Sequence, residues 1–253
     1  MIKVEGIVKS FGDNTVIKGV DAVFEQGKTN LIIGRSGSGK TVFLKSILGL
    51  YDVDEGEIIF GDQQISKLDK NEKKKLRQEM GMVFQGGALF DSLTVEENVM
   101  FPLNMFSEMS KEEKLDRANF CLNRVNLTDA NHRLPAEISG GMQKRVAIAR
   151  AISMQPKYLF CDEPNSGLDP ETSIVIDNLI REITQEFGIT TLVNTHDMNS
   201  VLEIGDNIIF LKDGIKAWQG SREEILTSDN EDISDYVFRS SLFKKVREAL
   251  RKS

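Results

Sequence analysis

Short runs of alternating apolar and polar residues fill positions 1 to 33, with turn signals at residues 12–14 and 26–28. This pattern predicts a small antiparallel sheet that leads into a buried strand at residues 31–33. From Lys40 to Leu50 the apolar residues recur at helical spacing instead. We therefore expect a strand that passes through a glycine-rich turn into a helix.

Four later segments have the composition of strands, and they occupy residues 57–60, 81–84, 158–161 and 190–194. Between about 91 and 155 the strand signals fade and helical ones dominate, which predicts a helical insert. Residues 208–211 and 215–218 flank Lys212-Asp213-Gly214, a hairpin signal. The pattern predicts an α/β fold with a mixed core sheet, flanking helices, a small N-terminal antiparallel sheet and a helical insert.

The end of the chain carries one more amphipathic pattern. Leu242, Phe243, Val246 and Leu250 form one apolar stripe, with basic residues elsewhere on the predicted helix. Such a stripe packs on its own protein, on a twin subunit or on a membrane. We expect one domain over residues 1–225, with its insert at about 91–155, and a C-terminal helical extension over residues 226–253.

Length and charge narrow the class of protein. The 253 residues are enough to bury a core without disulfides or metals, and 40% hydrophobic content excludes general disorder. A net charge of -7 argues against a protein whose main task is to bind a nucleic-acid duplex. The chain has no membrane-length apolar run and no signal peptide, so we expect it to stay in the cytoplasm.

Two further features have simple interpretations. Cys121 and Cys161 lack the spacing of a disulfide framework or a zinc site, so we expect buried or inert thiols. Basic residues predominate at 67–77, which is typical of a solvated helix face. Contact with a partner or with lipid headgroups is the alternative for this basic run.

The segment from Gly34 to Thr41 matches the P-loop pattern G-x-x-x-x-G-K-[ST], and it follows an apolar strand and opens a helix. Glycines let backbone N–H groups face phosphate oxygens, Lys40 reaches the β and γ phosphates, and the Thr41 hydroxyl ligates Mg²⁺. A plain glycine-rich turn is the alternative. The nucleotide-binding residues predicted here are Gly34, Ser36, Gly37, Ser38, Gly39, Lys40 and Thr41.

Two carboxylates stand at the end of the strand at 158–161. Asp162 is placed to hold Mg²⁺, and Glu163 is placed to polarise the water that attacks a phosphate. Both could instead be turn residues. Upstream, Ser139, Gly140 and Gly141 precede a helical run, which indicates either a second anion site or an ordinary helix cap.

The motifs follow one another in a fixed order: the P-loop, Gln85 after a strand, Ser-Gly-Gly at 139–141, Asp-Glu at 162–163, Ser166-Gly167-Leu168-Asp169 and His196-Asp197. From Phe11 to about Gly220, the chain resembles the nucleotide-binding domain of the ATP-binding cassette (ABC) superfamily. This resemblance implies a P-loop NTPase fold of ABC type and an ATPase that uses ATP and Mg²⁺. It also implies a homodimer in which residues 139–141 contact the ATP held by the opposite P-loop.

By the same resemblance, individual residues acquire roles. Phe11 would stack on adenine, Gln85 would link Mg²⁺ and the attacking water to the partner interface, and Asp169 would pair across the dimer. His196 would contact the γ-phosphate. Phe11 as a core aromatic and His196 as a structural histidine remain alternatives.

The sequence departs from the superfamily pattern at two positions. Met142 stands where glutamine is usual, and Phe11 replaces the commoner tyrosine. Phenylalanine still stacks on a base. We expect a working ATPase whose rate or dimer tightness differs.

A narrower resemblance covers residues 84–103 together with Ser-Gly-Gly-Met. These segments are similar to MlaF-like ATPases of phospholipid transporters, which work with MCE-domain proteins. The resemblance implies an integral membrane permease whose coupling helix enters a groove on this chain. It places the chain at the cytoplasmic face of the inner membrane, in contact with the membrane only through that permease. Four apolar residues would line the groove unless they pack internally: Phe90, Leu93, Val95 and Phe101.

Other classes fit less well. A DNA-repair cassette would place a long coiled coil between Lys40 and Asp162, and a translation cassette would be duplicated. A P-loop kinase leaves Ser-Gly-Gly and His196 unexplained. A cell-division-type ABC ATPase, which signals through a membrane complex without transport, shares every catalytic motif and remains the main alternative. Another lipid, lipoprotein or amino-acid transporter is a further neighbour.

Overall fold

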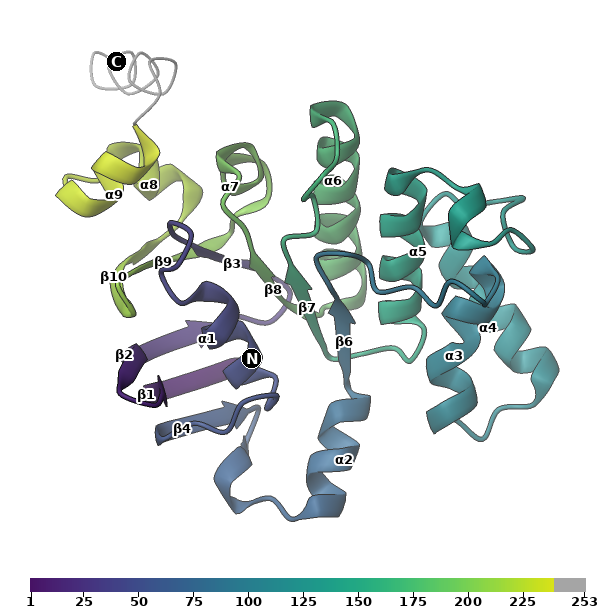
Figure 1. The fold of residues 1–253 in the computed structure, drawn as a ribbon, viewed down its shortest axis with the longest axis horizontal. Coiled ribbons are helices and arrows are strands. Elements are labelled where there is room, and N and C mark those ends of the chain that lie inside the picture. Colours follow the sequence, from purple (N-terminus) through teal and green to yellow (C-terminus); the bar gives the residue numbers. More distant parts are fainter. Residues whose placement is uncertain (239–253) are drawn as a thin grey trace. The chain divides into compact units, whose positions relative to one another are not determined.

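The computed structural model describes residues 1–238, which divide into two compact units (Figure 1). One unit comprises residues 1–68 and the segment that starts at residue 192, and the other comprises residues 69–191. The helix predicted around Leu242 to Leu250 lies outside the described residues.

The first unit holds the N-terminal sheet. Strand order β2-β1-β4-β5 with antiparallel pairing confirms the predicted small sheet. The remaining strands pair in a mixed way, since β9 is parallel to β3 and antiparallel to β10. The elements are β1 (Ile2–Phe11), β2 (Asn14–Phe24), β3 (Thr29–Ile33), α1 (Lys40–Ile47), β4 (Glu55–Phe60), β5 (Gln63–Gln64), η1 (Ile65–Lys67), α7 (Met198–Ile204), β9 (Asn207–Lys212), β10 (Ile215–Gly220), α8 (Arg222–Thr227) and α9 (Glu231–Val237).

The core of the first unit fixes the strand and helix on either side of the glycine-rich turn. All five residues of β3 are buried, which includes the apolar run at 31–33 that predicts a buried strand and the polar residues Thr29 and Asn30 before it. Helix α1 buries Phe43, Leu44 and Ile47 completely, and the ring of Phe43 lies 6.3 Å from that of Phe24. The turn between β3 and α1 is therefore held at both ends by packed apolar side chains.

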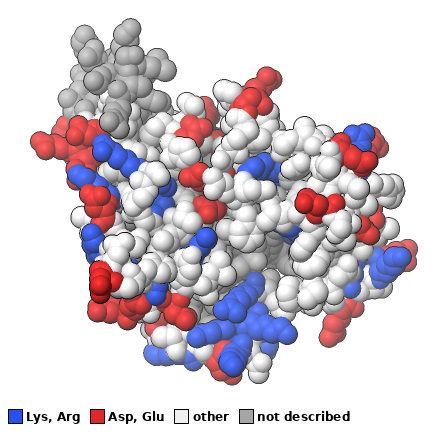
Figure 2. Space-filling model, viewed as in Figure 1, with Lys and Arg blue, Asp and Glu red and all other residues white. Residues whose placement is uncertain are grey.

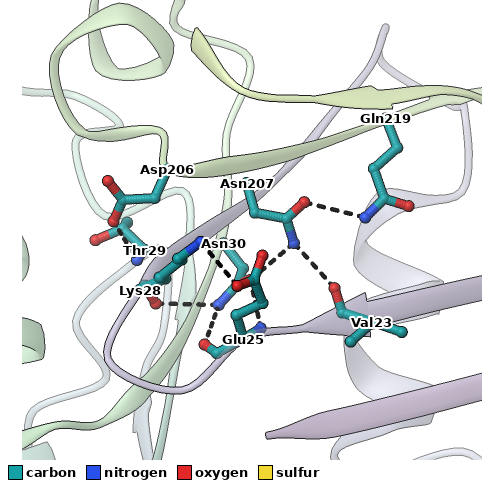
Figure 3. Close-up of polar contacts among 8 residues, drawn as sticks. All are labelled: Val23, Glu25, Lys28, Thr29, Asn30, Asp206, Asn207 and Gln219. Carbon is teal, nitrogen blue, oxygen red and sulfur yellow. Dashed lines mark hydrogen bonds and ion pairs between the residues drawn. The ribbon is translucent and has the colours of Figure 1, made fainter.

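A buried network of side-chain hydrogen bonds sets the register of β3 against β9 (Figure 3). Asn30 and Asn207 are register partners, and the Asn207 amide donates to the Asn30 side chain at 2.9 Å and to the Val23 carbonyl at 2.9 Å. Asn30 in turn donates to the main-chain carbonyls of Glu25 and Lys28, each at 3.0 Å. If the register shifted by one residue, these buried groups would lose their hydrogen-bond partners, which would lower the stability of the fold. The network therefore specifies one alignment of the two strands.

The second unit is rich in helices. Strands β6 and β7 pair in parallel, and the helical insert predicted at 91–155 is present as α3, α4, η2 and α5. Strand β8 (Thr190–Asn194) has the predicted bounds and runs from this unit into the first. The elements are α2 (Lys70–Gln78), β6 (Met80–Val83), α3 (Val95–Phe106), α4 (Lys111–Arg124), η2 (Pro135–Glu137), α5 (Gly140–Ile152), β7 (Tyr158–Asp162) and α6 (Pro170–Phe187).

The α/β class with a mixed sheet and a small antiparallel sheet is confirmed. Cys121 and Cys161 are free and buried, as expected. Val95 is fully buried, so of the two interpretations left open for it the internal packing holds: it opens α3 with its side chain in the core and does not line a groove. Across residues 1–238, no helix combines the length and apolar content needed to cross a bilayer.

Candidate functional site

The turn from Gly34 to Gly39 is a tight backbone loop that only glycine can form at two of its positions. A Cβ on Gly34 would lie 2.3 Å from the Leu211 carbonyl oxygen, and one on Gly39 would lie 2.8 Å from Ile17 Cδ1. Gly39 also has a φ of 100°, in the left-handed region that glycine tolerates. The loop therefore lies directly against β9 and β2, and its backbone can approach a ligand closely.

Lys40 and Ser38 give this loop its polar character. Lys40 is a buried residue, 6% exposed, and its ammonium donates to the carbonyls of Gly34 at 2.9 Å and Arg35 at 3.1 Å. The Ser38 hydroxyl is buried and has no hydrogen-bond partner among the described residues. A buried hydroxyl without a partner is costly unless a ligand satisfies it. The buried cation, this hydroxyl and the helix N-terminus together fit a phosphate group.

The end of β8 lies beside the same loop. The side-chain amide of Asn194 donates to the Thr41 hydroxyl at 3.2 Å. The backbone N–H of Thr195 donates to the Ile32 carbonyl at 3.1 Å, two residues before the glycine-rich turn. His196 follows directly and is exposed. The structure therefore brings Thr41 and His196 to the end of the strand that enters the P-loop.

Phe11, at the end of β1, is not a core aromatic. Its side chain is 45% exposed and meets the ring of Tyr51 edge-on, with 5.3 Å between centroids. Lys9 Nζ lies 5.4 Å from the centroid of the Phe11 ring. One face of an exposed ring with a cation nearby can still stack on a heterocycle.

In the second unit, Gln85 and Glu163 meet at the carboxyl ends of two parallel strands. Gln85 follows β6 and Glu163 follows β7, and the Gln85 amide donates to the Glu163 carboxylate and to the Ser166 hydroxyl, both at 3.3 Å. Asp162 ends β7 and is 7% exposed. Glu163 has a φ of 47°, a conformation that costs energy for any residue other than glycine and that clusters at functional sites.

Helix α5 holds the loop that carries Gln85, through two buried cations that the sequence analysis did not single out. Lys144 donates to the Gln85 carbonyl, and burial lowers the pKa of Lys144. The two terminal nitrogens of Arg150 donate to the carbonyls of Gly87 and Ala88, each at 2.7 Å, and burial lowers the pKa of Arg150 as well. Lys144 and Arg150 stand among apolar residues of the helix, and this pattern could have marked them in the sequence as buried cations. The sequence does not reveal which carbonyls accept their hydrogen bonds.

The Ser-Gly-Gly motif forms the exposed N-terminus of α5. The Ser139 hydroxyl caps the helix by accepting from the Met142 N–H at 3.3 Å, and Ser139 and Gly140 are both exposed. A Cβ on Gly141 would lie 2.6 Å from Thr172 Cγ2. The Thr172 hydroxyl and N–H donate to the Asp169 carboxylate at 2.6 Å and 2.9 Å, which lowers the pKa of Asp169. Thr172 therefore packs closely against Gly141 and is hydrogen-bonded to Asp169, so it connects the two residues.

The described residues contain no group of three or more His, Cys, Asp or Glu side chains that could hold a metal ion. Mg²⁺ in nucleotide sites usually takes one or two protein ligands and completes its shell with phosphates and water. Single candidate ligands are present, namely the Thr41 hydroxyl and the side chains of Gln85 and Asp162. Thr41 belongs to the first unit and the other two residues to the second, and each of these oxygen donors has the chemistry of a magnesium ligand.

The family model described as "ABC transporter" matches residues 17–166, a span that includes the P-loop, Gln85, Ser-Gly-Gly and Asp162-Glu163. The chain belongs to the ABC transporter family. Members of this family carry ABC ATPase domains, which bind ATP together with Mg²⁺. The resemblance drawn from the order of its motifs is thereby confirmed at the level of the family.

Relatives of known name cover most of the cassette. It is 36% identical to "Probable ribonucleotide transport ATP-binding protein mkl" of Mycobacterium bovis, over 93% of this chain and 66% of that protein. It is 38% identical to "L-cystine import ATP-binding protein TcyC" of Bacillus subtilis, over 92% of this chain and 95% of that one. The cassette thus spans slightly less than two thirds of the mycobacterial relative.

A solved structure has the same fold. The ATP-binding cassette MJ0796, solved as a dimer in a post-hydrolysis state with ADP and Pi, matches with a TM-score of 0.78 and 37% sequence identity. The match covers 88% of this chain and 99% of that one.

Proposed function

We propose that this ABC cassette is the ATP-hydrolysing subunit of a membrane transporter and that two copies close around two ATP molecules. The observation that carries the proposal is the P-loop, where a buried lysine and an unsatisfied buried serine hydroxyl face a backbone cradle. The exposed N-terminus of α5 at Ser139 and Gly140 supports the dimer, since it offers free helix N–H groups to a phosphate of another molecule.

Residues of the first unit bind the nucleotide. Lys40 and the loop N–H groups hold the β and γ phosphates, with Gly34, Ser36, Gly37, Ser38 and Gly39 forming the cradle. Phe11 stacks on adenine with its exposed ring, and His196 contacts the γ-phosphate. Asn194 orients the Thr41 hydroxyl through its hydrogen bond.

Residues of the second unit carry the hydrolysis. Glu163 polarises the attacking water, and Gln85, which donates to Glu163, couples that carboxylate to the rest of the loop. Bound Mg²⁺ neutralises phosphate charge, and Thr41, Gln85 and Asp162 would hold it. Ser139, Gly140, Gly141 and Asp169 act across the dimer.

An apolar groove in the second unit supports a membrane partner. It has a volume of about 440 Å³, and we call it the aromatic groove because it is lined by Phe84, Phe90, Phe101 and Phe106, together with Met80 and Met82. The rings of Phe90 and Phe101 are 4.4 Å apart. Asn98, which is fully buried, fixes this wall by accepting from the Phe90 N–H at 2.8 Å and donating to the Phe90 carbonyl at 3.1 Å.

The aromatic groove suits an amphipathic helix that inserts its apolar face. We assign it to a cytoplasmic helix of an integral membrane permease. Phe90 and Phe101 line this groove, which supports the assignment, while Leu93 is half-buried. The cassette itself would lie at the cytoplasmic face of the inner membrane.

Phospholipid is the substrate that we propose, carried by the permease with an MCE-domain lipid-binding protein. The support is the similarity of residues 84–103 and of Ser-Gly-Gly-Met to MlaF-like ATPases. Import of a small solute is the second candidate, favoured by the cystine and ribonucleotide names of the relatives. A cell-division-type ATPase without transport is the third.

Purification of the tagged cassette from detergent-solubilised membranes tests these proposals. Co-purification of an integral membrane permease, an MCE-domain protein and bound phospholipid supports the full assignment. A permease accompanied by a solute-binding protein, with ATP turnover stimulated by cystine or a ribonucleotide, would replace phospholipid by a solute. Recovery with division proteins, or without any membrane protein, would overturn transport.

A matched pair of substitutions tests the aromatic groove. Phe106 lies in the groove and is 47% exposed, whereas Phe120 on α4 lies outside it and is 44% exposed. Phe106→Ser should abolish co-purification of the permease, and Phe120→Ser should leave it intact. Equal loss in both variants would refute the assignment of the groove.

A further inference from the structure

Helix α2 carries a concentrated positive charge in a chain whose net charge is -7. Figure 2 shows Lys and Arg side chains gathered over this helix. Within nine residues it has five basic side chains and one acidic side chain. We call the five its basic face: Lys70, Lys73, Lys74, Lys75 and Arg77.

The four lysines of the basic face have no ionic or side-chain hydrogen-bonding partner within residues 1–238. Lys70, Lys74 and Lys75 are exposed, and neither they nor Lys73 form an ion pair or a side-chain hydrogen bond with another described residue. The nearby carboxylates of Asp69 and Glu72 are engaged in a capping box at the start of the helix. Four lysines close together repel one another, and an external anion bound to them would relieve this repulsion.

The composition of the helix favours a lipid surface over a protein partner. Leu76 is its only buried residue, and the exposed side of α2 has no aromatic or aliphatic side chain that could anchor a protein interface. Protein interfaces are depleted in lysine and enriched in arginine, whereas the basic face has four lysines and one arginine. Flexible lysine side chains suit the diffuse field of an anionic bilayer. Aromatic residues that would stack on nucleic-acid bases are absent from α2.

The position of α2 in the second unit agrees with this assignment. The helix packs against β6, and Met80, two residues after its end, lines the aromatic groove. The basic face is therefore next to the surface that we assign to the permease.

We propose that the basic face of α2 binds the anionic headgroups of a lipid bilayer and so holds the cassette against the membrane beside its permease. The contact with lipid is direct, which departs from the expectation that this chain meets the membrane only through another protein. The inference takes its membrane setting from the proposed function, but the contact itself is a property of the cassette alone.

Sedimentation of the purified cassette with vesicles tests the proposal. We expect binding to vesicles of phosphatidylcholine and phosphatidylglycerol in equal amounts, and none to phosphatidylcholine alone. Binding should disappear between about 0.1 M and 1 M salt, as the screening length shortens. The triple substitution Lys70→Gln, Lys74→Gln and Lys75→Gln should weaken binding by about tenfold or more, with ATP turnover in buffer unchanged.

The matched control removes three lysines elsewhere, through Lys18→Gln, Lys111→Gln and Lys114→Gln, and should bind anionic vesicles as the wild type does. Three results would overturn the proposal. The α2 variant could bind anionic vesicles as tightly as the wild type, the control variant could lose as much vesicle binding as the α2 variant, or the cassette could bind duplex DNA more tightly than anionic vesicles. An α2 variant that still binds vesicles but loses the permease in detergent would assign the basic face to a protein instead. If the cassette binds anionic vesicles but no permease co-purifies with it from membranes, the lipid contact is supported and the proposed transporter function is refuted.

Discussion

The hydroxyl of Tyr236 donates a hydrogen bond to the main-chain carbonyl of Gly34, with 3.3 Å between the two oxygens. The same carbonyl accepts from Lys40. Tyr236 lies on α9, and its ring packs against Phe210 with 4.9 Å between centroids. The last described helix is thus connected directly to the first residue of the P-loop.

Loss of this hydroxyl should loosen the P-loop without unfolding the chain. In Tyr236→Phe the ring still packs on Phe210, and the neutral hydrogen bond to the Gly34 carbonyl is removed. We expect nucleotide affinity to fall about two- to tenfold, which corresponds to the usual net value of such a bond. Titration with a fluorescent ATP analogue measures the affinity, and thermal unfolding serves as the control. An unchanged affinity would mean that the contact does not position the loop.

Replacement of the carboxylate at Glu163 should separate binding from hydrolysis. Gln fills the same space but cannot polarise water, so Glu163→Gln should bind ATP, lose turnover by about a hundredfold or more and accumulate as a dimer. Phosphate release and size-exclusion chromatography with ATP measure the two effects. Glu112→Gln on the exposed side of α4 is the control and should behave as the wild type. Normal turnover in Glu163→Gln would remove this residue from the mechanism.

The two glycines at the start of α5 should respond differently to alanine. A Cβ at Gly140 meets only Leu168 at an ordinary 3.8 Å, whereas one at Gly141 meets Thr172 at 2.6 Å. Thr172 cannot move without disturbing its bonds to Asp169. Gly141→Ala should therefore lower the free energy of unfolding by about 1 to 3 kcal/mol.

Gly140→Ala should leave that free energy unchanged or slightly higher, because alanine favours a helix. Urea denaturation compares the two variants. Equal stabilities would show that Thr172 moves aside freely and does not link the motif to Asp169.

The buried thiol of Cys121 should make the protein less stable in alkali. Burial raises the pKa of Cys121 from 9.0 to about 11. Between these values the unfolded chain releases the proton while the folded chain keeps it. The free energy of unfolding therefore falls as the pH rises, by about 2 to 3 kcal/mol in total, and levels off above about pH 11.

Comparison with Cys121→Ala isolates this contribution. The other titrating groups are the same in both proteins, so they cancel in the difference, and the small cavity left by alanine adds a constant offset. Urea unfolding at a series of alkaline pH values should show a shallower decline for the variant. Parallel curves for the two proteins would contradict the raised pKa.

Local patterns determined the elements of this protein. The strand at 190–194 and the turn between β3 and α1 were predicted from contiguous residues, because strand burial and glycine-rich turns depend on neighbours in the sequence. The order of the nucleotide motifs likewise identified the family before any geometry was known. Each element and each single motif can be recognised in the sequence because it consists of residues a few positions apart.

Burial at the start of α3 was decided differently. The sequence left the same two interpretations open for Phe90 and Val95, a groove wall or internal packing, yet Phe90 is 42% exposed and Val95 is fully buried. The periodic pattern gives a helix an apolar side but does not say which apolar residues the rest of the core will cover. The tertiary packing of α3 alone made this choice.

The sequence by itself determined the chemical groups of the site and the elements that carry them. The tertiary structure decided which distant groups support them: Arg150 donates to a carbonyl 63 positions away at Gly87, and Tyr236 to one 202 positions away at Gly34. The acceptors in both contacts are main-chain carbonyls, which every residue possesses. No residue type marks such an acceptor in a sequence, so only the folded backbone can reveal it.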